Sequence, residues 1–141
     1  MYKCKYYKLQ ELVPPDVYQK FGDFAWLFFG ENELKDIDTI REYHGPITIN
    51  NWHIGGNLRN CGLRTNLYEK NKLYCSAHLM GKAFDLHSSN IKKLYSDINI
   101  LFAGGKLKAI KRIESPLTTK YNWCHVDSFR TDKKELEVFM G

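Results

Sequence analysis

Apolar side chains recur at helical spacing in two parts of the chain, and these parts predict its main helices. In segment 32–45 they fall three residues apart on one face, at Leu34, Ile37 and Ile40. Asn32 caps this segment, and Gly45-Pro46 ends it. A second series lies at 91–102, at Ile91, Leu94, Tyr95, Ile98 and Phe102. Ser88, Ser89 or Asn90 would cap it, and Gly104-Gly105 would end it.

Shorter signals predict one more helix and three strands. Pro14-Pro15 suits the first turn of a helix near 16–21. Segment 47–52 alternates like a strand, and 108–114 with 121–129 predict a hairpin around the loop 115–120. The polar stretch 57–74 predicts a long loop. Because these elements do not alternate as βαβ units, we expect an α+β fold with a small antiparallel sheet and helices packed on one side.

Length and composition favour one domain over residues 1–141. With 43% hydrophobic and 14% aromatic residues, the chain can bury a single core, and its length leaves no room for a second. The net charge of +5 favours anionic partners, among them nucleic acid and bacterial cell walls. Since no run of five basic residues occurs, a solvated and mildly basic surface explains the charge better than a nucleic-acid interface.

Two histidines and a carboxylate, His78, Asp85 and His125, form the ligand set of an open catalytic zinc site, which leaves a fourth position for water. The first two would be roughly 10 Å apart along a helix or about 23 Å apart along a strand. Neither separation suits one ion. The chain must therefore reverse between them, and Gly81 is the residue at which a reversal is sterically easiest. His87, two residues beyond Asp85, is the best substitute ligand.

The motif around these ligands resembles a known peptidase family. Residues 76–85 match the pattern S-x-H-x-x-G-x-A-x-D at Ser76, His78, Gly81, Ala83 and Asp85, and W-x-H-x-D follows at 123–127. The pattern is similar to the zinc D-Ala-D-Ala carboxypeptidases and L-alanyl-D-glutamate endopeptidases, whose fold is shared with the hedgehog signalling domain. The resemblance covers about 46–129, whereas residues 1–45 carry no usable motif.

The resemblance implies roles for individual residues. His78, Asp85 and His125 would be the zinc ligands. Arg64, in a segment similar to the turn that precedes the first ligand in this family, would be the cation that faces the substrate. Its guanidinium could hold a peptide carboxylate or a developing oxyanion. A surface arginine that closes a turn is the alternative interpretation of Arg64.

The sequence departs from the family at the catalytic base. Many members have Glu, Asp or His three residues before the last ligand, where this chain has Asn122, and an amide cannot take the proton. Glu114, beside Ser115, resembles a Glu-Ser pair of the hedgehog branch and would lie across the hairpin from the last ligand. We expect Glu114 to be the base, with a solvated strand-end carboxylate as the alternative. Asp127 shares a strand face with His125 and could orient it or act as base itself.

These observations predict a zinc metallopeptidase that hydrolyses peptidoglycan stem peptides as a D,D-carboxypeptidase or an endopeptidase. Three alternatives stay open: a non-catalytic zinc-binding module of cell wall or virion, a basic nucleic-acid-binding protein, and a peptidase with another substrate. The sequence does not define the scissile bond or the oligomeric state.

The chain's amino terminus lacks the apolar stretch of a secretory signal, and its longest apolar run, 24–29, is far shorter than the roughly 20 residues of a membrane span. We therefore expect synthesis in the cytoplasm and, as in phage endolysins, action on the wall after release.

Overall fold

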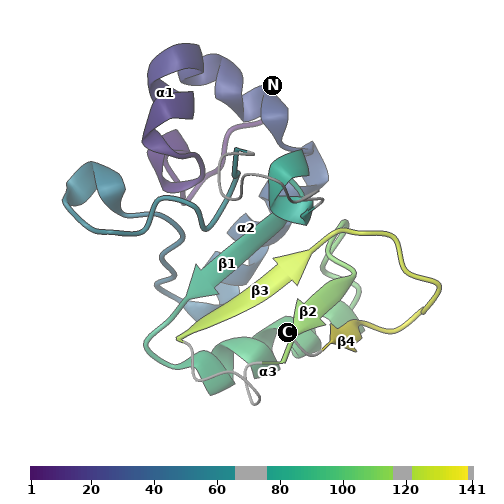
Figure 1. Ribbon diagram of the computed structural model, residues 1–141. Helices are drawn as coiled ribbons and strands as arrows, with labels where there is room; N and C mark the ends of the chain where they lie inside the picture. Colours follow the sequence, from purple (N-terminus) through teal and green to yellow (C-terminus); the bar gives the residue numbers. More distant parts are fainter. Residues whose placement is uncertain (66–75, 116–121, 140–141) are drawn as a thin grey trace, which may run out of the picture.

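A four-stranded sheet with the order β1-β3-β2-β4 forms the centre of the protein (Figure 1). The computed structural model describes residues 1–65, 76–115 and 122–139. The strands are β1 (Ala83–His87), β2 (Arg112–Glu114), β3 (Trp123–Asp127) and β4 (Glu137–Phe139). β3 pairs antiparallel with both β1 and β2, which confirms the predicted hairpin, although the hairpin loop at 116–121 lies outside the described residues.

The α+β class is confirmed, but the prediction of an antiparallel sheet is wrong, because the sheet is mixed. β4 pairs parallel with β2, with Glu137 opposite Arg112 and Phe139 opposite Glu114. The connection 128–136 carries the chain from the end of β3 past β2 to the far edge. At three residues, β4 is too short for a period-two pattern to be recognised in the sequence.

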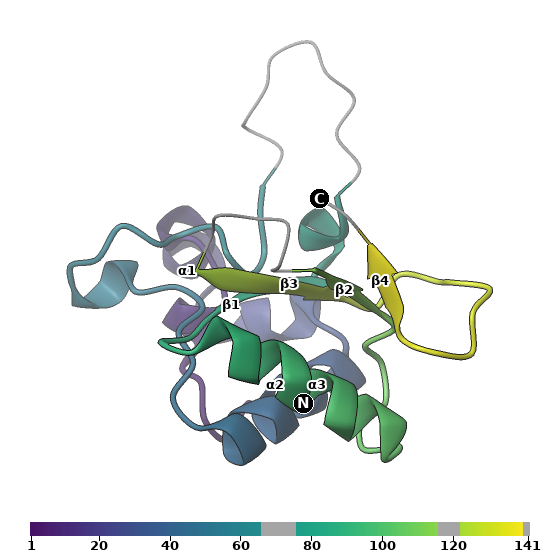
Figure 2. The same cartoon turned by 90° about the horizontal axis from the view of Figure 1, so that it is seen from below.

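The two longest helices, α2 (Glu31–His44) and α3 (Ile91–Ala103), lie side by side on one face of the sheet (Figure 2). Both were predicted. The cap of α3 is Asn90, whose side chain accepts a hydrogen bond from the Lys93 N–H at 3.1 Å. α2 begins one residue before the predicted cap, since Gly30 occupies the N-cap position. The helix predicted near 16–21 is α1 (Pro15–Phe21).

Short 3-10 helices make most of the remaining turns. They are η1 (Leu9–Glu11), η2 (Gly22–Phe28), η3 (Trp52–Ile54) and η4 (Ala77–Met80). Among the described residues, none of the helices is both long enough and apolar enough to span a lipid bilayer.

The strand predicted at 47–52 is reduced to a single bridge between Thr48 and His87. Ile47 and Ile49 are buried, as the alternation predicts. Beyond them Asn50 leaves the strand pattern, because its side chain accepts from the N–H of Cys61 at 2.9 Å and donates to a carbonyl of the segment before α1. The backbone N–H of Asn50 also donates to the Glu11 carbonyl at 2.9 Å, so this residue pairs with other segments of the chain and not with the sheet. Of the long loop predicted at 57–74, residues 66–74 lie outside the described part.

One hydrophobic core joins the amino-terminal third to the sheet. It contains side chains from Tyr7 to Leu136, and the face of β1 and β3 toward the helices contributes Phe84, Leu86, Cys124 and Val126. The other face of these strands carries polar side chains. The core therefore anchors the sheet from one side and leaves the opposite face available for chemistry.

The buried carboxylate of Asp36 ties α2 to the segment that leads into β2. Its two oxygens accept from the backbone N–H groups of Lys108, Ala109 and Ile110 at 2.7, 2.7 and 2.9 Å. Two residues further along α2, Asp38 holds the amino-terminal segment through three further hydrogen bonds. α2 therefore connects two distant segments that carry no regular structure of their own.

We expect Asp36→Ala to lower the free energy of unfolding by about 3 kcal/mol, because it leaves three backbone donors without their charged acceptor. Urea denaturation of the purified variant measures this change. Asp36→Asn, which keeps one acceptor oxygen, should lose less, and the exposed Asp132→Ala should stay within about 0.5 kcal/mol of the parent. Equal stability of Asp36→Ala and the parent would contradict the role of Asp36.

Candidate metal centre

The reversal predicted at Gly81 is confirmed and places His78 beside β1. His78 lies in η4, where the Ser76 hydroxyl accepts a hydrogen bond from its backbone N–H at 3.2 Å. Gly81 follows with φ at +67°, a conformation that favours glycine. A Cβ at Gly81 would lie 2.1 Å from the carbonyl oxygen of Phe28. The turn thus packs directly against the backbone of η2.

A second close approach fixes segment 61–65. A Cβ at Gly62 would lie 2.2 Å from the carbonyl oxygen of Leu12, and the next residue, Leu63, donates its N–H to the same carbonyl at 2.8 Å. Two backbone hydrogen bonds join this segment to the predicted metal ligands. Arg64 donates its N–H to the His78 carbonyl at 3.1 Å, and the Asp85 N–H donates to the Cys61 carbonyl at 2.7 Å.

The other two predicted ligands face each other across the β1–β3 pair. Asp85 and His125 are partners in the antiparallel register, so their side chains leave the same face of the sheet. The turn at Gly81 brings His78 to this face. All three predicted metal ligands therefore converge, although they lie on η4, β1 and β3.

The three donor atoms form a nearly equilateral triangle. Nε2 of His78 lies 3.2 Å from Nδ1 of His125, and Oδ1 of Asp85 lies 3.3 and 3.0 Å from these nitrogens. Ligands that surround an ion as a tetrahedron, with bonds of about 2.0–2.1 Å, are about 3.3 Å apart. The triangle therefore matches one face of a tetrahedral site, and it could hold a metal ion.

Hydrogen bonds behind the triangle direct the lone pairs of both histidines toward its centre. Nδ1 of His78 lies 2.8 Å from the Gly62 carbonyl oxygen, and Nε2 of His125 lies 2.8 Å from Oδ2 of Asp127. Both partners accept only, so each of these nitrogens carries a proton. In the neutral imidazoles the opposite nitrogens, which form the triangle, are then free to ligate. Such outer partners are typical of metal-binding histidines.

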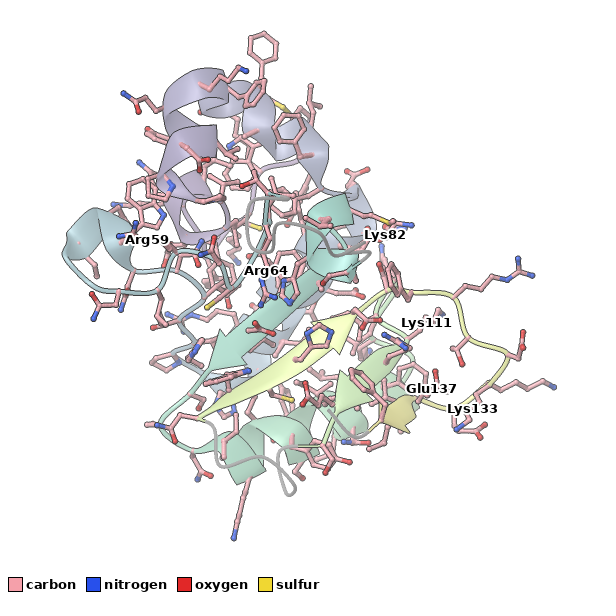
Figure 3. The ribbon with its side chains drawn as sticks, viewed as in Figure 1. Arg59, Arg64, Lys82, Lys111, Lys133 and Glu137 are labelled. Atoms are coloured by element: carbon pink, nitrogen blue, oxygen red, sulfur yellow. The ribbon has the colours of Figure 1, made fainter. Side chains whose placement is uncertain are left out.

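Two arginines complete the surroundings of the cluster. Arg64 donates from Nη2 to Oδ2 of Asp85 at 2.8 Å, through the oxygen that is not part of the triangle. Arg112 donates from Nε and Nη2 to the two oxygens of Asp127 at 2.8 and 2.9 Å. Figure 3 shows Arg64 beside β1. Arg64, which we expected to face the substrate, therefore holds the predicted metal ligand Asp85 in place.

Asp127 receives donors at both oxygens. Besides His125 and Arg112 it accepts from the backbone N–H of Phe129 at 3.1 Å. Of the two roles open to Asp127, orientation of His125 fits these contacts, because both oxygens are already in use. Sequence reasoning missed Arg112: strand alternation indicates its face, but its place beside Asp127 depends on the register of β2 with β3.

Glu114 stands on the same face of the sheet as the cluster. Arg112 pairs with Asp127 in register and in side-chain contact, so Glu114, two residues further along β2, points to this face and lies at the position opposite His125. Its side chain is half-buried. Asn122 is exposed and precedes the start of β3. His87, the substitute ligand, is outside the triangle, with Nδ1 3.3 Å from the Thr48 carbonyl oxygen.

The histidine and the two carboxylates of the site shift one another's pKa toward the ionised forms. Burial lowers the pKa of His125, but hydrogen bonds to Asp127 and Asp85 outweigh burial and raise the pKa to about 9. Burial raises the pKa of Asp127, yet the bonds from His125 and Arg112 lower it to about 2. Burial raises the pKa of Asp85 as well, but its contacts with His125 and His78 outweigh burial and take the pKa well below its usual value. Both carboxylates are therefore ionised at neutral pH.

A cavity of about 240 Å³ opens beside Asp85, on the side of Arg64. Trp123 and His87 form one wall, and residues 57–61 form the other. A ligand in this cavity would lie next to the metal cluster and between an aromatic and a basic side chain, with Arg59 at the rim (Figure 3).

The raised pKa of His125 predicts that metal affinity depends on pH. Between pH 6.5 and about 9 the metal-free imidazole carries a proton that an entering ion must displace. The apparent affinity should therefore rise by about tenfold per pH unit in this window and level off above it. Competition with a chromophoric chelator measures this slope. Asp127→Asn should move the plateau to lower pH, whereas an affinity independent of pH would contradict the protonated state.

The chain matches no protein-family model, no curated protein and no solved structure.

Proposed function

We propose that this protein is a zinc peptidase that hydrolyses peptide bonds in peptidoglycan stem peptides, as a D,D-carboxypeptidase or an endopeptidase. The observation that supports it most is the convergence of His78, Asp85 and His125 into one triangle with the spacing of a tetrahedral metal site. Two nitrogens and one carboxylate are the donor set of hydrolytic zinc sites with an open position. The resemblance of the motif to D-Ala-D-Ala peptidases, with their hedgehog-like fold, supplies the substrate class.

The proposed mechanism assigns each residue one task. His78, Asp85 and His125 would hold the ion, and zinc bound there would lower the pKa of water toward about 7 and polarise a carbonyl group. Glu114 accepts the proton of the attacking water and returns it to the leaving amine. Asp127 keeps His125 in the ligating tautomer. Arg64 fixes Asp85 and places positive charge at the cavity beside the scissile bond.

The second candidate is a non-catalytic zinc-binding module of cell wall or virion with the same fold. Two observations favour it: Asn122 occupies the position at which many members of the family carry a base, and Asp127 already receives donors at both oxygens. Both candidate functions include a bound zinc ion, but only the peptidase turns over a substrate. In either case we propose synthesis in the cytoplasm and action at the wall after release.

Metal content and turnover on the same sample test the proposal. We expect one equivalent of zinc, together with D-Ala or a cleaved stem peptide in the mass spectrum after incubation with purified peptidoglycan fragments. His125→Ala should lose both, because a donor is removed. His87→Ala is the matched control and should keep its zinc. Zinc without any product would favour the non-catalytic module, and absence of zinc from metal-replete protein would refute the site.

Glu114→Gln separates catalysis from metal binding. The amide cannot take a proton, so turnover should fall by about 100-fold to 10,000-fold while zinc content stays unchanged. Product formation under saturating substrate measures the loss, and the exposed Glu135→Gln is the control for the change in charge. A Glu114→Gln variant as fast as the parent would assign the base to another group.

A further inference from the structure

A second hollow of about 580 Å³ lies at the end of the sheet where β1 begins and β3 ends. We call it the basic cleft. Figure 3 shows Lys82, Lys111 and Lys133 on this side of the molecule. Five of its nine lining residues are basic; the full lining is Glu33, Lys82, Ala109, Lys111, Ser128, Arg130, Thr131, Lys133 and Lys134.

The basic cleft is distinct from the metal centre. Lys82 precedes Ala83, whose side chain shares the face of Asp85, so strand alternation directs Lys82 to the opposite face. Lys111 precedes Arg112 in the same way. On that side α2 contributes Glu33 to the lining. A ligand in the cleft therefore need not compete with one at the metal.

The backbone that carries these cations is fixed by the sheet. The N–H of Ser128 donates to the Lys82 carbonyl at 3.0 Å, and the N–H of Lys111 donates to the Asp127 carbonyl at 3.0 Å. The carbonyl of Lys111 in turn accepts from Glu137 N–H at 2.9 Å. Lys82 and Lys111 thus project from defined positions, which lowers the entropy lost when they bind a ligand together.

Carboxylates balance the positive charge of the cleft only in part. Glu33, the one acidic residue of the lining, already accepts a hydrogen bond from the Ser128 hydroxyl at 2.8 Å. Lys133 has an ion pair with Glu137 at 3.7 Å. Within the described ranges, the other four basic residues of the lining form no ion pair with a carboxylate. With Glu33 and Glu137 set against the five basic residues, the cleft keeps an excess of three positive charges at one concave place.

The lining also restricts the kind of anion. It contains no aromatic side chain, and proteins that hold single-stranded nucleic acid stack its bases on aromatic rings. A duplex presents its phosphates on a convex surface and would touch only the rim of a hollow this size. Several cations around a narrow cleft suit a thin, flexible chain with repeated phosphate groups and no bases.

We propose that the basic cleft binds the phosphate groups of a polyol-phosphate polymer, the kind of anionic chain that accompanies peptidoglycan in some cell walls. The cleft would hold the protein on the wall while the metal centre faces its own ligand. The choice of a wall polymer rests on the proposed action at the wall, whereas the binding step itself uses none of the metal ligands.

Calorimetric titration of the metal-loaded full chain with short poly(glycerol phosphate) tests this site. We expect saturable binding that weakens with added salt. Lys82→Gln/Lys111→Gln should reduce the affinity by about tenfold or more, because two charge-assisted contacts are lost. Lys133→Gln/Lys134→Gln, in an exposed loop where folding is not at risk, should reduce it as well. Peptidase turnover on soluble fragments should stay unchanged in both.

The matched control is Lys20→Gln/Lys92→Gln, which removes the same charge from exposed positions outside the cleft and should change the affinity less than about twofold. If the control lost as much affinity as the cleft variants, net charge alone would explain the effect, and the proposed site would be overturned. Three other results would overturn it: tighter binding of duplex or single-stranded DNA than of poly(glycerol phosphate), equal affinity for inorganic phosphate alone, or no saturable binding at all.

Discussion

The pairing of β1 with β3 sets Asp85 opposite His125, and the metal centre depends on this register. A slip by one residue would turn every side chain of one strand to the other face. If β1 slipped, Phe84 and Leu86 would leave the core, at a cost of about 1.5–3 kcal/mol for each large apolar side chain. Burial on the helix side of the sheet therefore positions the polar ligands on the other side. The chemistry of the site is held in place by side chains that never contact it.

Buried carboxylates organise the rest of the molecule, each through a different kind of partner. Asp36 is surrounded by backbone N–H groups, Asp85 by two histidines and Arg64, and Asp127 by His125, Arg112 and a backbone N–H. A buried charge is costly unless it is paired and hydrogen-bonded. Because these partners come from distant segments, each carboxylate selects one arrangement of the chain. The positions of the metal ligands are therefore determined before any ion enters.

Local patterns predicted much of this structure. The 3.6-residue period of α2 and α3, the reversal at Gly81 and the shared face of His125 and Asp127 follow from short stretches of sequence, and the structure contains all of them. What local patterns could not supply are contacts between distant segments: the parallel return of β4, the Gly62 carbonyl behind His78, and the gathering of separate lysines into the basic cleft. The strand predicted at 47–52 failed for the same reason, because Asn50 bonds to the distant backbone of Glu11, Val13 and Cys61.

The amino-terminal third contains no recognisable motif, yet the two turns that build the metal centre rest on its backbone. Gly62 lies against the carbonyl of Leu12 and Gly81 against that of Phe28, both too close for a side chain to intervene. The motif is therefore not a transferable module. A fragment limited to 46–129 would contain every ligand and lack the surface that shapes their approach, so a graft of these residues onto another scaffold would also need a backbone with two matching carbonyls.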